Sequence, residues 1–186
     1  MICREEPPSE RATQLLVAHL ALMFIVKLLF PNLNLFFLLV GASISGFDAL
    51  LPVFRFKNED YHCGSVFHSV WLPLASAAFL LAFNTVWSAS MLIGGLLHLL
   101  ADSTDVRGRP WLYPLGKKTY GIDIFPYNFK DYVSNPLCLA IEVASILLIM
   151  AYAYMFGIDL LSLLWFALLL PLFGIFVLHQ WKKAKK

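Results

Sequence analysis

The run Met91-Leu-Ile-Gly-Gly-Leu-Leu-His-Leu-Leu-Ala-Asp102 is apolar except for two ionisable side chains. His98 and Asp102 stand four residues apart, so on a helix both side chains lie on one face. An imidazole and a carboxylate at that spacing can bind one metal ion. They can also form a buried hydrogen bond that only holds two helices together. The pair alone therefore leaves a metal or catalytic site and a structural contact as equal alternatives.

The composition of the whole chain is typical of a protein embedded in a lipid membrane. Its 186 residues are 60% hydrophobic and 14% charged, and the mean hydropathy is +0.73. A soluble domain is closer to half apolar and a quarter charged. No basic stripe with interleaved aromatic residues occurs, which argues against nucleic acid as a partner. The three cysteines are widely spaced and form no CxxC, so neither a disulfide framework nor a thiolate zinc site is expected.

The hydrophobic pattern predicts an all-α, polytopic integral membrane bundle of about six helices, folded as a single membrane domain over 1–186. The expected spans are residues 12–30, 35–54, 65–83, 85–102, 136–156 and 158–179. Glycines and serines in the second span predict a break before Asp48. The segments expected outside the spans are an N-terminal segment (1–11), an amphipathic interfacial loop (103–135) and a basic tail (180–186).

The lysines and arginines predict the orientation of these spans. Six spans place both termini on one side of the membrane. Basic residues precede the first span, occupy the second and fourth connectors and close the chain, whereas only Lys27 lies elsewhere, within the first span. The positive-inside rule therefore predicts that both termini and both long loops are cytoplasmic, in a plasma or inner membrane. The N-terminus lacks the basic region of a signal peptide, so the first apolar segment is expected to be retained.

With this orientation, ionisable residues from several spans meet at the cytoplasmic face. Such groups are costly in a membrane and are usually functional, so their coincidence favours a shared site. The expected metal ligands are Asp48, His68, His98, Asp102 and His19. The residues expected to orient a ligand or to transfer a proton are His62, Asp105 and Glu142.

The loop over 103–135 combines aromatic and basic side chains. Aromatic rings and cations are both typical of the headgroup layer, where cations meet lipid phosphates. The residues expected to hold a substrate headgroup are Arg107, Arg109, Lys117 and Lys118. Simple anchoring of the loop at the membrane surface explains the same residues equally well.

Three segments resemble the YdjM-like family of predicted membrane-bound metal-dependent hydrolases. Gly46-Phe-Asp-Ala-Leu-Leu-Pro52 is similar to the family's Pro-Asp-x-Asp-His stretch, with one of its two aspartates. His62-Cys-Gly-Ser-Val-Phe-His68-Ser69 is similar to its His-Arg-Gly-x-Thr-His-Ser stretch, with one extra residue between the histidines. The segment Gly94–Asp102, followed by Gly108-Arg-Pro-Trp-Leu-Tyr-Pro114, is similar to its Gly-x-x-x-His-x-x-x-Asp segment and the downstream Gly-x-Pro-Leu-x-x-Pro.

The resemblance implies that Asp48, His68, His98 and Asp102 share a metal site, and that His19 matches an early histidine that the family often has. The function then expected is a membrane-embedded metal-dependent hydrolase, which cleaves an ester or phosphoester bond of an amphiphilic, lipid-like substrate at the cytoplasmic face. A divalent ion would acidify a water molecule and polarise the reacting oxygen. Zinc is the expected ion, with manganese or iron as alternatives.

Two other functions compete with hydrolysis. In an ion- or proton-coupled transporter or channel subunit, the same histidines and aspartates would relay protons or coordinate the transported ion. Polar residues at one face, with no evident inverted repeat, argue against it. In a noncatalytic membrane scaffold, the metal would be structural. The expected partner is a membrane lipid or lipid-linked molecule, and the sequence leaves the oligomeric state open.

Overall fold

The computed structural model describes residues 16–44, 68–104, 110–116, 118, 120–122, 124 and 134–184. These residues contain six helices: α1 (Leu16–Leu29), α2 (Leu35–Ile44), α4 (Trp71–Leu81), α5 (Thr85–Asp102), α7 (Pro136–Phe156) and α8 (Leu160–Ala184). No strand occurs among these elements, which confirms the all-α prediction. Each helix coincides for most of its length with one of the six expected spans.

Only two of the described helices are long and apolar enough to cross a membrane, namely α5 and α7. The other apolar helical stretches run over Val17–Leu29, Leu35–Ile44, Trp71–Leu81 and Leu160–Leu169. The 11 residues of α4 rise by about 16 Å, roughly half of the ~30 Å hydrocarbon layer. The helix order is therefore confirmed, whereas six complete crossings stay a prediction.

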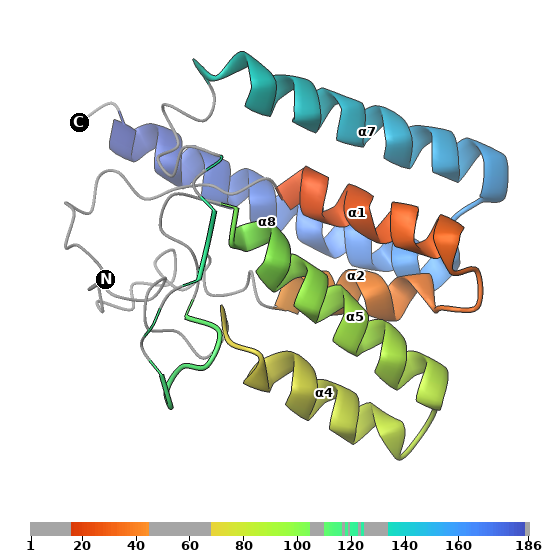
Figure 1. The fold of residues 1–186 in the computed structure, drawn as a ribbon. Helices are drawn as coiled ribbons and strands as arrows, with labels where there is room; N and C mark the ends of the chain where they lie inside the picture. The colour runs from red at the N-terminus through yellow and green to blue at the C-terminus, as the bar shows by residue number, and fades with distance from the viewer. Residues whose placement is uncertain are drawn as a thin grey trace.

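The helices form three hairpins whose tight connections all lie at one end of the bundle, on the right in Figure 1. A polar side chain begins the second helix of each hairpin. Asn34 Oδ1 accepts from the Phe37 N–H at 3.1 Å, and Asn84 Oδ1 accepts from Val86 and Trp87. Asp159 accepts from the Ser162 N–H at 2.9 Å. These caps satisfy backbone donors that a helix start leaves without partners.

Glycines bring α5 into close contact with α2 and α4. A Cβ at Gly94 would run into the Leu38 carbonyl of α2, and one at Gly41 into the Met91 carbonyl of α5. A Cβ at Gly95 would lie 2.6 Å from Cβ and Cγ of Pro73 on α4. Small residues at such crossings let helix backbones approach closely. His98 lies on α5, one turn beyond this crossing.

The last two helices, α7 and α8, pack against α1 and α2. Phe24 of α1 is fully buried and meets Tyr152 of α7 edge-to-face, with ring centroids 4.9 Å apart. Trp165 of α8 donates its indole N–H to Ser43 Oγ of α2 at 3.2 Å. The outer faces of α7 and α8 carry exposed apolar side chains such as Met150 and Leu161. Such faces suit contact with lipid chains rather than with water.

Candidate metal centre

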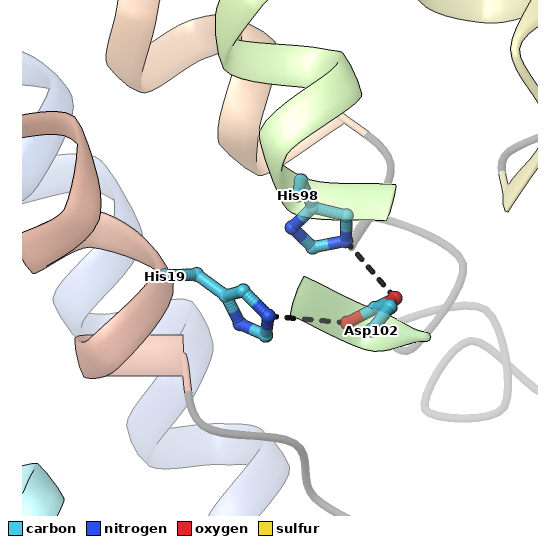
Figure 2. Close-up of side chains that lie close together, drawn as sticks. All are labelled: His19, His98 and Asp102. Atoms are coloured by element: carbon cyan, nitrogen blue, oxygen red, sulfur yellow. Dashed lines mark ion pairs between the residues drawn. The ribbon is translucent and has the colours of Figure 1, made fainter. Parts of the chain in front are cut away.

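Asp102, at the last residue of α5, is contacted by three histidine side chains. The Nε2 atom of His19 lies 3.3 Å from Asp102 Oδ1. The Nε2 atoms of His68 and His98 lie 2.9 Å and 3.3 Å from Asp102 Oδ2. Figure 2 shows the imidazoles of His19 and His98 directed at the two carboxylate oxygens. All four residues are buried, with at most 5% of each exposed.

Three separate segments supply these four residues. His98 and Asp102 occupy the last two turns of α5, four residues apart on one face. His19 belongs to the first turns of α1, and its ring centroid lies 4.8 Å from that of His98. His68 precedes α4, and its ring lies 5.9 Å from that of His98. The cluster thus occupies the end of the bundle opposite the three tight connections (Figure 1).

Hydrogen bonds through Trp111 fasten the His68 segment to the end of α5. The Val70 N–H donates to the Trp111 carbonyl at 2.9 Å, two residues after His68. The Trp111 indole N–H donates to Ser103 Oγ at 2.8 Å, next to Asp102. Ser103 Oγ in turn donates to the Leu99 carbonyl at 2.8 Å. Trp111 was not predicted as a site residue, although the Gly108–Pro114 motif that contains it was the available signal.

We expect Trp111→Phe to loosen the His68 segment while it keeps most of the packing. The change removes one hydrogen bond to Ser103, which corresponds to about 1 kcal/mol of unfolding free energy. Chemical unfolding in detergent micelles measures the loss. Trp87→Phe is the matched control, because the Trp87 indole stacks on Phe37 at the far end of α5. Equal stabilities of the two variants would contradict this role of Trp111.

The structure brings together four of the predicted ligands: His19, His68, His98 and Asp102. Glu142 is half-buried on α7, a helix that packs against α1, and its role as a base stays a prediction. Lys118 is exposed and lies 5.3 Å from the ring centroid of Tyr120. The other predicted site residues lie outside the described residues: Asp48, His62, Asp105, Arg107, Arg109 and Lys117.

The donor atoms fit a divalent cation. One ligand atom each from His19, His98 and Asp102 lies within 4.8 Å of the other two. Two donors of a tetrahedral zinc ion lie about 3.4 Å apart, so binding would draw the most distant pair together by up to about 1.4 Å. Besides the Nε2 atom that meets Asp102, the Nδ1 atom of His98 is buried and has no hydrogen-bond partner among the described residues. A buried imidazole nitrogen without a hydrogen bond is costly, and a metal bond would use its lone pair.

The chain matches the model of a known protein family. The model of a family described as "YdjM inner membrane protein" matches residues 10–183. Comparisons with curated proteins and with solved structures give no match. The matched region contains the described helices α1 to α7 whole and α8 without its last residue, Ala184. It also contains every residue of the cluster around Asp102.

Proposed function

The chain belongs to the YdjM family of inner membrane proteins, and from this premise we propose that it is a membrane-embedded, metal-dependent hydrolase. Its proposed substrate is an amphiphilic, lipid-like molecule with an ester or phosphoester bond. The convergence of three imidazoles on the carboxylate of Asp102 carries the proposal. Ionisable groups are rare inside membrane proteins, and where they cluster they usually serve a function. A cluster of this composition offers a divalent ion both nitrogen and oxygen donors.

The residues of the cluster divide into ligands and a supporting group. His19, His98 and Asp102 would hold the ion, because their donor atoms are mutually close. When bound, the ion would polarise an ester or phosphoryl oxygen and lower the pKa of water. His68 Nε2 lies 2.9 Å from Asp102 Oδ2 and would keep the carboxylate oriented, as residues behind metal ligands commonly do. That His68 is itself a ligand stays a prediction.

The position of the cluster supports an amphiphilic substrate. It lies at one end of the bundle, whereas a transport pathway would place polar groups near the middle of the membrane. The charge distribution of the sequence favours the cytoplasm as the side on which this end lies. At this end of the bundle, near the membrane surface, the headgroup of a lipid would reach the buried ligands while its chains stay in the hydrocarbon layer. Lys118, exposed beside Tyr120, would meet the negative charge of such a headgroup.

Metal analysis of purified protein tests the proposal. We expect the wild type to retain one divalent ion per chain and His98→Ala to bind it at least about tenfold more weakly, because a nitrogen donor is lost. Ser88→Ala is the control: Ser88 is a buried residue of α5 that donates to the Ala77 carbonyl, remote from the cluster. Negligible metal in both the wild type and His98→Ala would refute the metal site.

Hydrolysis assays then separate catalysis from a structural role. Purified protein loaded with zinc, manganese or iron is incubated with vesicles of phosphatidylglycerol and phosphatidylethanolamine, and released products are measured. We expect release that disappears in His98→Ala and persists in Ser88→Ala. Metal binding that stabilises the fold, without release from any ester or phosphoester lipid, would instead favour the noncatalytic scaffold.

A further inference from the structure

A second polar site lies at the opposite end of the bundle, among the tight connections. It is a pocket of about 430 Å³. Its lining includes Lys27, Asn32, Asn34, Tyr152, Gly157 and Asp159. These residues come from the end of α1, the α1–α2 connector, the end of α7 and the α7–α8 connector. Neither the family description nor the proposed hydrolase assigns a role to this pocket.

Lys27 and Asp159 give the pocket one positive and one negative group. Lys27 Nζ donates to the carbonyls of Pro31 and Leu33, both at 2.6 Å. Asp159 Oδ1 accepts from the Ser162 N–H at 2.9 Å, and its Oδ2 accepts from Ser162 Oγ at 2.7 Å. Within the described part of the chain no ion pair joins Lys27 to Asp159. Local hydrogen bonds therefore hold two opposite charges at one pocket, and the two charges do not pair with each other.

Both groups keep the capacity to bind a ligand. A lysine ammonium has three N–H donors, and carbonyl oxygens occupy two of those of Lys27. A carboxylate has about four lone-pair positions, of which Ser162 uses two on Asp159. The pair is thus complementary to a ligand that carries both an anionic group and a cationic group.

Apolar side chains next to the pocket show what the remainder of such a ligand would be. Leu29 and Phe30, which follow Lys27 closely, are 68% and 59% exposed. Leu160 and Leu161, which follow Asp159, are 69% and 57% exposed. In an inner membrane protein such side chains face hydrocarbon. A ligand here would keep its charges in the pocket and its chains against these residues.

We propose that this pocket binds the zwitterionic headgroup of a phospholipid with a primary ammonium, of the phosphatidylethanolamine type. Its phosphate would accept from Lys27, and its ammonium would donate to Asp159. The site lies at the other end of the bundle from Asp102, so it does not depend on the hydrolase proposal. A lipid bound here would join the α1–α2 hairpin to the α7–α8 hairpin.

Native mass spectrometry of the delipidated full-length protein tests this assignment. We expect the wild type to bind phosphatidylethanolamine about tenfold more tightly than phosphatidylglycerol with the same chains, which lacks the ammonium. Asp159→Asn should abolish the preference, because it removes the charge that faces the ammonium. Lys27→Gln should weaken the binding of both lipids, because both carry the phosphate. Asparagine can still accept from the Ser162 N–H, so the cap of α8 is kept. Lys27→Arg should retain the affinity for both lipids, and Lys118→Gln, a control among the residues that follow α5, should retain the affinity and the preference.

Several outcomes would overturn the proposal. One is equal affinity of the wild type for the two lipids, another is a preference that survives Asp159→Asn, and a third is unchanged binding of both lipids by Lys27→Gln. Free O-phosphoethanolamine that binds as tightly as the lipid would assign the pocket to a soluble zwitterion instead. Far-ultraviolet circular dichroism identifies any variant that has lost its helices. Loss of the preference with wild-type helicity supports the assignment.

Discussion

Asp102→Ala is expected to lower the unfolding free energy by about 3–5 kcal/mol, the usual cost of removing one partner from a buried charged contact. The two Asp102 oxygens lie within 3.3 Å of three imidazole nitrogens, and the residue is only 1% exposed. Alanine would leave His19, His68 and His98 buried without this acceptor. Reversible unfolding in mixed micelles, monitored by helicity, measures the change.

The same measurement separates a metal site from a purely structural hydrogen-bond cluster. An ion that binds only the folded protein adds about 2.7 kcal/mol when its concentration is 100 times its dissociation constant. We therefore expect zinc to stabilise the wild type and a chelator to reverse the effect, with neither acting on Asp102→Ala. Asp102→Asn keeps the side-chain shape and one acceptor oxygen, so it should be more stable than alanine yet equally insensitive to zinc. An Asp102→Ala protein within about 0.5 kcal/mol of the wild type would contradict the central role of this carboxylate.

The contact of His98 with Asp102 was predictable because helical geometry relates residues four apart, and both lie on the same helix, 3.3 Å apart. The approach of His68 and His19 was predictable because alternating helix directions and the distribution of basic residues place them at one end. The spacing of these residues in the sequence could not predict how the four side chains are arranged around one another. Three imidazoles share the carboxylate of a single aspartate, and His68 is held there through Trp111, a connection made by a loop and not by helix periodicity.

Helix lengths were less predictable than helix order. Hydropathy counts apolar residues, but local polar bonds decide where a helix ends. Within the described part of the expected third span, residues 68–83, the helix α4 runs over Trp71–Leu81. It starts late because Val70 is bonded to Trp111, and the next helix begins where Asn84 caps it. An apolar stretch of spanning length therefore need not be one continuous helix.

Gly94→Val is expected to destabilise the bundle by about 3 kcal/mol, the upper part of the range for overpacked cores. A Cβ at this position meets the Leu38 carbonyl, and a backbone atom of α2 cannot turn aside as a flexible side chain can. The helices must move apart, and both Gly41 and Gly95 lie at the same crossing. Because His98 lies one turn further along α5, we also expect weaker metal binding in the folded fraction.

Gly174→Val is the matched control for this prediction. Gly174 lies within α8, and a Cβ there would have nothing within 4 Å. Valine and glycine differ little in helix propensity, so this variant should stay within about 0.5 kcal/mol of the wild type. The comparison holds the change of residue constant and varies only the surroundings. Equal stabilities of the two valine variants would mean that α2 and α5 do not cross at Gly94, and the placement of His98 beside His19 and Asp102 would lose its structural basis.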